Sequence, residues 1–409
     1  MKLHALETFA VAPPPPGWGG RYWLIVRVTT ACGITGLGEV YAAGVGPKAM
    51  RAVIEDVFAR HMAGENPENI ELMARRAWSS GFTQRPDPTV WGAFSGLEMA
   101  CWDILGKARD RPVWALLGGR MNDRLRAYTY LYPADGLPAA DVRQFWIDPR
   151  MQAEAAAARL AEGWTAVKFD PAGPYTIRGG HAPAASDISR AAAFCAAIRA
   201  AVGDRADLLF GTHGQFTPGH AIRLARALEP HDPLWFEEPI PPDDIAGLAE
   251  VARATSIPVA TGERLCGKME VHAALRAGVR IVQPALGRAG GIWEGRKIAV
   301  LAEAHSAQIA PHLYAGPVEW AASVHLGVAC PNLLMLEAIE SPFHDALVTG
   351  RPAVEDGFVA APDAPGLGIA LDDALAAAHV HDGDRLHLEM QEAPCDWQNG
   401  NAFAGGAAD

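Results

Sequence analysis

Apolar residues recur along this chain in two patterns, and the change from one pattern to the other divides the chain into regions. Segments near the start are rich in β-branched and aromatic residues, which predicts strands. These predicted strands span 2–11, 21–30 and 36–41. Helical patterns follow over 47–63, 67–81 and 92–110. Three strands followed by helices predict an α+β module in residues 1–125.

From about residue 126 a short apolar run and a helical pattern alternate repeatedly. The predicted strands span 127–131, 164–170, 207–211, 233–237, 257–261, 279–283, 307–311 and 333–337. The predicted helices between them span 151–162, 189–202, 219–229, 243–254, 268–277, 289–306 and 317–328. Strands that alternate with helices in this way indicate a parallel (β/α) barrel. A doubly wound sheet is the alternative, but no glycine-rich dinucleotide-binding turn follows the first strand.

The fold prediction is therefore an α/β protein, with a (β/α) barrel of the modified TIM type over residues 126–340. We expect residues 1–125 to form a capping domain, and residues 341–409 to pack back on it. The last ten residues are mostly glycine, alanine and asparagine, which predicts a frayed tail. Residues 12–20, which carry four prolines and Trp18, are expected to close over the barrel mouth.

Composition narrows the class of protein. Of 409 residues, 50% are hydrophobic and 20% are charged, which is typical of a globular chain. A formal charge of −12 argues against a nucleic-acid surface. The start of the chain lacks the apolar core of a signal peptide, and no run is long enough for a membrane span, so we expect a cytoplasmic protein. The six scattered cysteines show no CxxC spacing, which predicts buried reduced thiols and no zinc site.

Two acidic residues are the strongest chemical signal. Glu237 and Glu263 lie 26 residues apart, and each follows a short apolar strand. The carboxyl ends of parallel barrel strands meet at one mouth, so both carboxylates are expected there. Convergent carboxylates are what a hard cation such as Mg²⁺ prefers. Another step of 26 residues towards the N-terminus reaches Gly211, which has no side chain to offer.

Other polar residues follow the remaining strand ends. They are Lys168, Asp170, His213, Arg264, Gln283, Arg288, His312 and Glu337. Each has a structural alternative: a solvated lysine, an aspartate that caps the turn before Pro171, a loop histidine, or an acid that bridges to an arginine. Strand interiors rarely carry polar groups without a reason. Their joint placement at successive strand ends therefore predicts an active site.

Several segments carry a family resemblance that covers nearly the whole chain. They lie at 93–107, 112–119, 235–239, 257–263 and 290–291. The first two resemble the junction of capping domain and barrel in the enolase superfamily, in particular its mandelate racemase/muconate lactonizing enzyme-like branch. The other three resemble the fourth to sixth strand ends of that family.

This resemblance implies an enzyme that removes a proton α to a carboxylate and stabilises the enediolate on Mg²⁺. Glu237 and Glu263 would be metal ligands. Lys168 would neutralise the substrate carboxylate. His312 would act as general base or acid, and Glu337 would hydrogen-bond the substrate carboxylate.

The chain departs from the family pattern at three positions. The first metal ligand of the family falls at Gly211, the second lysine of its Lys-x-Lys pair is Asp170, and the acid that orients the seventh-strand histidine falls at Ala285. We therefore predict that Asp170 replaces the missing ligand and binds the metal together with Glu237 and Glu263, while substrate and waters complete an octahedron.

The position of His213 resembles the sugar-acid dehydratases of this branch, in which the equivalent histidine protonates a departing hydroxide. The predicted function is Mg²⁺-dependent dehydration of an aldonate or aldarate to a 2-keto-3-deoxy acid. Arg264, Arg288 and Tyr314 are predicted to contact substrate hydroxyls. A racemase, epimerase or cycloisomerase acting at the same α-carbon is one alternative. A catalytically silent barrel with a binding role is another. The resemblance also implies a homo-oligomer, either a dimer or an octamer.

Overall fold

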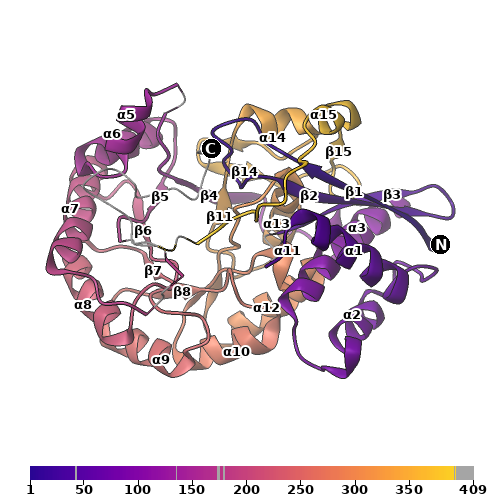
Figure 1. The fold of residues 1–409 in the computed structure, drawn as a ribbon, viewed down its shortest axis with the longest axis horizontal. Helices are drawn as coiled ribbons and strands as arrows, with labels where there is room; N and C mark the ends of the chain where they lie inside the picture. The colour runs from indigo at the N-terminus through magenta and orange to yellow at the C-terminus, as the bar shows by residue number, and fades with distance from the viewer. Residues whose placement is uncertain (42–43, 135, 173–175, 178–179, 391, 393–409) are drawn as a thin grey trace.

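The computed structural model describes residues 1–409 except 42–43, 135, 173–175, 178–179, 391 and 393–409. The predicted frayed tail and Cys395 therefore lie outside the described residues. Figure 1 shows a ring of strands surrounded by helices, with a second body of sheet and helices packed beside it. In the described part of the chain, no helix is long and apolar enough to cross a membrane.

The capping region follows the predicted order of strands and then helices. Its elements are β1 (Leu3–Val11), β2 (Trp23–Thr30), β3 (Thr35–Val40), α1 (Pro47–His61), α2 (Ile70–Trp78), a 3₁₀ turn (Ser80–Phe82), α3 (Pro88–Ala108) and α4 (Val113–Leu116). The three strands form one antiparallel sheet with β2 in the middle.

Helix α3 is the centre of the capping region. Its residues are buried without a break from Trp91 to Gly106, so it is covered by protein on every side. It packs so closely on β3 that the contact requires glycine. A Cβ at Gly38 would lie 1.8 Å from the backbone oxygen of Gly96, which no side chain tolerates.

Eight parallel strands form the barrel. They are β4 (Arg124–Tyr130), β5 (Ala166–Phe169), β6 (Asp207–Gly211), β7 (Trp235–Glu237), β8 (Val259–Thr261), β9 (Ile281–Val282), β10 (Gln308–Ile309) and β11 (Leu336–Ala338). Successive strands pair from β4 to β10, and β11 pairs with β4. Ile309 of β10 also pairs with Leu333, just before β11, so the ring closes. The predicted barrel is confirmed.

Helices cover the outside of the ring (Figure 1). They are α5 (Ala139–Phe145), α6 (Pro149–Ala161), α7 (Ala185–Val202), α8 (Pro218–Leu228), a 3₁₀ turn (Glu229–His231), α9 (Ile245–Ala254), α10 (Lys268–Ala277), α11 (Leu286–Ala289), α12 (Gly291–Ala304) and α13 (Pro317–Ala329). The barrel interior is filled by one buried cluster: Tyr128, Ala166, Leu209, Trp235, Ala260, Ile281, Ala310 and Met335.

The C-terminal segment contacts both bodies. Its elements are α14 (Pro342–Leu347), β12 (Val348–Thr349), β13 (Val354–Glu355), β14 (Phe358–Ala360), β15 (Ala370–Leu371) and α15 (Asp373–Ala378). Strand β14 pairs antiparallel with β4 of the barrel. Val380 pairs with Val11 at the end of β1. The segment therefore ties the barrel to the capping sheet.

Two buried carboxylates join the capping region to the barrel. Glu39 on β3 accepts hydrogen bonds from three backbone amides at the N-terminus of α13, and Glu98 on α3 accepts from two at the N-terminus of α12. The donors are Gly316, Val318 and Glu319 for the first carboxylate, and Ile292 and Trp293 for the second. Both helices begin after a glycine, which has no side chain to cap them. The capping region thus supplies caps that the barrel sequence lacks.

The described cysteines are free thiols, as predicted. The expectation that they are buried holds for Cys101, Cys195, Cys266 and Cys330. It was wrong for Cys32, which is exposed in the turn between β2 and β3.

Candidate active site

The predicted site residues come from the carboxyl ends of neighbouring strands. Lys168 lies in β5, Glu237 is the last residue of β7, and Glu337 lies in β11. Glu263 and His312 follow β8 and β10 within three residues. Because parallel strands end at one mouth, a set of residues far apart in sequence meets there.

Lys168 is the central cation of this mouth. Its Nζ lies 2.6 Å from Glu237 Oε1 and 3.3 Å from Glu337 Oε1. Burial alone would lower its pKa, but the two carboxylates raise that pKa well above the usual value. Glu237 Oε2 accepts a hydrogen bond of 2.7 Å from Gln283. The ammonium is therefore charged and held between two acids.

His312 lies between two carboxylates. Its Nε2 is 3.2 Å from Glu263 Oε2 and 3.9 Å from Glu337 Oε2. Burial lowers the pKa of His312 to about 3, and the nearby Lys168 works in the same direction. The imidazole is therefore neutral near pH 7 and able to accept a proton. Ala285 provides no acid to orient this histidine, but two glutamates lie within reach.

Arg264 pairs with two acids that follow β7 and β8. Its guanidinium lies 2.6 Å from Glu238 Oε2 and 3.3 Å from Glu263 Oε1. Burial raises the pKa of Glu238 to about 7, although Arg264 opposes this shift. Arg264 therefore reaches the mouth, as predicted, but as a partner of these two carboxylates.

The other two predicted substrate contacts lie near the capping side. Arg288 donates to the backbone oxygen of Glu263 at 3.3 Å and stacks 4.8 Å from the ring centroid of Tyr41. Tyr314 faces His387 of the C-terminal segment edge-on, with ring centroids 6.1 Å apart. Burial raises the pKa of Tyr314 to about 12, so it stays protonated. A role for either in substrate binding stays a prediction.

Asp170 and His213 meet across neighbouring strand ends. Asp170 Oδ2 lies 3.1 Å from His213 Nδ1, and Tyr130 donates its hydroxyl to Asp170 Oδ1. Burial lowers the pKa of His213, but the hydrogen bond and charge of Asp170 outweigh it, and the net shift is upward. His213 is thus the opposite of His312: its charged form is stabilised.

Gly211, the position of the missing family ligand, lies beside these residues. A Cβ built there would be 3.4 Å from Asp170 Cβ and 3.6 Å from Lys168 Cε. Those are ordinary contact distances, so a small side chain fits. The space that the family fills with an acid is therefore bordered here by Asp170 and Lys168.

Two residues that help to build the site were not predicted from the sequence. Thr212 donates its hydroxyl to the backbone oxygens of Glu237 and Glu238, at 3.0 and 2.6 Å, and so joins the ends of β6 and β7. Tyr130, at the end of β4, holds Asp170. Its position at the end of the first barrel strand was the signal that could have found it.

The proline-rich loop reaches the mouth, as expected. Trp18 stacks on Tyr132 with ring centroids 4.1 Å apart, and Tyr132 stacks on Tyr130 at 4.8 Å. Because Tyr130 contacts Asp170, this aromatic stack connects the loop with Asp170.

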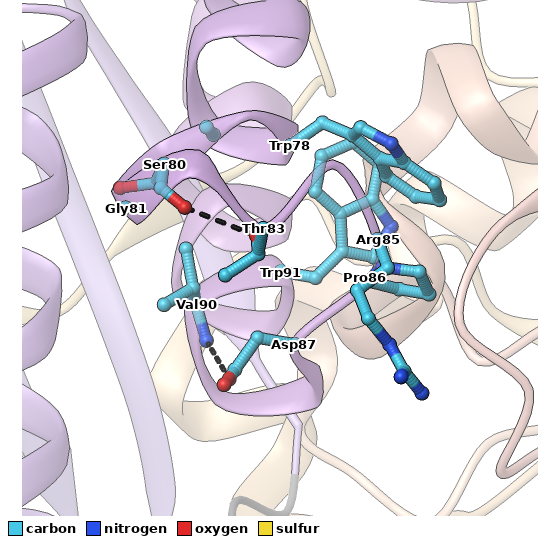
Figure 2. Close-up of a pocket in the computed structure, with 10 residues that line it drawn as sticks. Trp78, Ser80, Gly81, Thr83, Arg85, Pro86, Asp87, Val90 and Trp91 are labelled. Atoms are coloured by element: carbon cyan, nitrogen blue, oxygen red, sulfur yellow. Dashed lines mark hydrogen bonds between the residues drawn. The ribbon is translucent and has the colours of Figure 1, made fainter.

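A separate cavity of about 220 Å³ lies in the capping region between α2 and α3. Figure 2 shows Trp78 and Trp91 forming one wall, with Arg85 and Asp87 nearby. None of its lining residues belongs to the strand-end cluster. The cavity is therefore distinct from the barrel mouth.

Comparisons with known families agree with this geometry. Residues 19–118 match the mandelate racemase/muconate lactonizing enzyme N-terminal domain, and residues 150–375 match the enolase C-terminal domain-like family. The chain belongs to the enolase superfamily. This superfamily member is 34% identical over 382 residues to a D-xylonate dehydratase of Haloferax volcanii, covering 90% of this chain and 88% of that enzyme. It is 30% identical over 411 residues to a D-galactonate dehydratase of Ralstonia nicotianae, covering 98% and 97%.

Solved structures support the same membership. The mandelate racemase/muconate lactonizing enzyme from Jannaschia sp. CCS1 shares 75% identity at a TM-score of 0.93, covering 95% of this chain and all of that one. The mandelate racemase/muconate lactonizing enzyme-like protein from Roseovarius sp. TM1035 shares 66% identity at 0.95, covering 97% and 100%.

Superfamily membership implies a magnesium ion, and the residues can be tested for one. Among the described residues, no group of three or more His, Cys, Asp or Glu side chains is placed so that it could hold a metal ion. The donor chemistry nevertheless suits Mg²⁺. Glu263 Oε2 is buried without a hydrogen-bond donor in the described structure, and it lies in the same network as Glu237. Mg²⁺ commonly takes one or two carboxylates and keeps substrate and water as its other ligands, so this pair fits it.

Proposed function

We propose that this enolase-superfamily member dehydrates an aldonate or aldarate to a 2-keto-3-deoxy acid in a Mg²⁺-dependent reaction. Its dehydratase relatives identify it as a hydro-lyase of the superfamily. The observation that carries the proposal is that two histidines with different partners lie at the strand ends: His312 Nε2 is 3.2 Å from Glu263 Oε2, and His213 Nδ1 is 3.1 Å from Asp170 Oδ2. His312 is kept neutral and His213 is favoured in its charged form. Dehydration needs one base and one acid.

The substrate carboxylate has a natural place beside Lys168. This ammonium is charged, buried and flanked by Glu237 and Glu337. Burial raises the pKa of Glu337, which favours a protonated carboxyl able to donate a hydrogen bond to a carboxylate. Lys168 would neutralise one oxygen, and Glu337 would hydrogen-bond the substrate carboxylate.

The two histidines divide the chemistry. The neutral imidazole of His312 takes the proton from the carbon next to the carboxylate. The imidazolium of His213 gives its proton to the hydroxyl on the next carbon, which departs as water. The resulting enol becomes the 2-keto-3-deoxy acid, so one water is lost and no redox change occurs. Each positioned proton transfer contributes about 10²–10⁴-fold to the rate.

Glu237 and Glu263 would hold the magnesium ion. When bound, the ion supplies positive charge that offsets the charge developing on the substrate carboxylate. Asp170 was predicted as a third ligand, but its contacts favour another role.

Epimerisation would begin with the same removal of the α-proton. It would differ in the next step, in which a charged histidine returns a proton to the carbon. The dehydratase names of the relatives favour loss of water. The two outcomes differ in product: a 2-keto acid, or an inverted substrate.

The test is turnover of a library of aldonates and aldarates, with D-xylonate and D-galactonate included, in Mg²⁺ and in EDTA. We expect 2-keto acid from one or a few members in Mg²⁺ only, and none with Glu263→Gln. Inverted substrate without 2-keto acid would replace the proposal by epimerisation. If neither product nor α-proton exchange in D₂O is seen, the barrel is silent.

A further inference from the structure

We propose that Asp170 is a positioning residue for His213 and that the two form a histidine–aspartate dyad across the ends of β5 and β6. This rests on the proposed function for the role of His213 as general acid. It replaces the prediction that Asp170 binds the metal.

The contacts of Asp170 support this assignment. The residue is 3% exposed, and its two oxygens point to different partners. Oδ2 lies 3.1 Å from His213 Nδ1, and Oδ1 accepts from the hydroxyl of Tyr130. An acid at Nδ1 fixes the tautomer and ring orientation of a histidine, and it stabilises the imidazolium. It also leaves Nε2 as the nitrogen that meets substrate.

The backbone at His213 points to the same role. Its φ of 51° is in the left-handed region, which residues other than glycine rarely adopt. Two hydrogen bonds hold this conformation: Gly214 N–H donates to Glu238 O at 2.6 Å, and Gln215 Nε2 donates to His213 O at 3.0 Å. A conformation that costs about 1–3 kcal/mol persists only where surrounding contacts impose it, and such positions cluster at functional sites.

The glycine at Gly211 is consistent with this role for Asp170. The superfamily pattern places a carboxylate at Gly211 and a lysine at Asp170, whereas this chain has neither. The position of a Cβ at Gly211 is 3.4 Å from Asp170 Cβ, so the acid at Asp170 lies directly beside the place where the family pattern has one. The carboxylate therefore stands on the β5 side in place of β6, where it meets His213.

The first experiment compares Asp170→Asn with the wild-type enzyme on its best acid-sugar substrate. An amide keeps the shape but cannot stabilise the imidazolium. We expect kcat to fall by about 10²–10⁴-fold, with KM and the Mg²⁺ dissociation constant unchanged within about threefold. Asp207→Asn is the matched control. Asp207 lies at the opposite end of β6 and pairs with Arg126 at 2.7 Å, so its kcat should stay near wild type.

A substrate with fluoride in place of the departing hydroxyl separates positioning from a merely structural effect. Fluoride leaves with less help from an acid, so the defect of Asp170→Asn should shrink at least about tenfold on this substrate. An equal defect on both substrates would overturn the dyad.

A crystal structure with MgCl₂ and calorimetric Mg²⁺ binding decide the assignment without turnover. The dyad predicts Asp170 on His213 in the Mg²⁺-bound enzyme. Asp170 on the ion, or a loss of Mg²⁺ affinity of about tenfold or more in Asp170→Asn, would overturn it. If no acid sugar is dehydrated, the proposed function fails, and these two measurements still test the pairing.

Discussion

At the scale of single residues, the site depends on how similar side chains are made different by their neighbours. His312 is buried and His213 is partly exposed, but only His213 has an aspartate within 3.1 Å of its ring nitrogen Nδ1. His312 instead shares its surroundings with Lys168, whose charge disfavours a second cation. In the proposed function, His312 is therefore the base and His213 the acid.

Separate loss of each histidine should therefore stop different steps. With His312→Asn we expect no exchange of the substrate α-proton in D₂O and no product. With His213→Asn we expect product formation to fall at least about 10²-fold while α-proton exchange continues. Proton NMR of the substrate measures both. Exchange lost in His213→Asn but retained in His312→Asn would reverse the two roles.

Restoring the missing family ligand is a second residue-scale prediction. Gly211→Asp places a Cβ at contact distance from its neighbours, so the fold should tolerate it. A third carboxylate near Glu237 should strengthen Mg²⁺ binding about tenfold, measured by calorimetry. The uncharged Gly211→Asn is the control and should gain less. Weaker binding in Gly211→Asp would mean that the ion does not lie next to β6.

The sequence predicted which residues reach the mouth but not which partners they take. Strand ends mark Lys168 and Glu337 as site residues. Their contact at 3.3 Å spans 169 positions and depends on closure of the ring between β4 and β11. Asp170 and His213 follow the paired strands β5 and β6, but the sequence does not tell which neighbour the aspartate takes as its partner.

At the scale of elements, the barrel strands and helices were predictable from two patterns. Each strand is a short run of apolar residues, and each helix repeats its apolar residues with a helical spacing. Helix α5 was missed because its seven residues are too few to show a helical period. Strands β12 to β15 are two or three residues long, which is too short to show an alternating pattern, and all but β14 pair only with one another. The capping residues Glu39 and Glu98 were not predicted. They come from the capping region, so they leave no pattern in the sequence next to the barrel helices that they cap.

Removing one such cap should destabilise the whole protein. In Glu98→Leu, the amides of Ile292 and Trp293 lose a buried acceptor, and we expect a loss of about 2–4 kcal/mol in the free energy of unfolding. Chemical denaturation measures it. The matched control is Glu154→Leu on the exposed face of α6, which should change stability by less than about 0.5 kcal/mol. Equal effects of both would argue against a capping role.

A second contact between the bodies should give a pH dependence. Glu71 of α2 is partly desolvated, which raises its pKa, but Lys297 and Arg75 lower that pKa to about 2. A lowered acid pKa means that the contribution to stability is present above the unfolded value of about 4.5 and is lost as pH falls towards 2. Because Glu71 is half exposed, the effect should stay below about 1 kcal/mol.

Thermal melting of Glu71→Gln checks this sign. The variant should melt about 1–3 °C below wild type at pH 7, and the difference should vanish at the lowest pH at which both stay folded. A difference that grows as pH falls would contradict the assignment.

At the scale of the whole molecule, the proposed chemistry lies at the barrel mouth, and the capping region contacts the barrel through Trp18, which stacks on Tyr132, and through caps on two of its helices. The C-terminal segment joins the two by pairing with both β4 and the end of β1. The predicted homo-oligomer stays a prediction, which light scattering of the purified protein tests.

The central claim is that this cluster of acids, histidines and Lys168 works as a Mg²⁺-dependent dehydratase. The most direct test is the rate of 2-keto acid formation by protein stripped of metal and then titrated with MgCl₂. We expect negligible turnover without metal and a saturable return of activity, lost in Glu263→Gln. Full turnover in the stripped protein would contradict it, because Lys168, already bound to Glu237 and Glu337, would then suffice as the only cation the reaction needs.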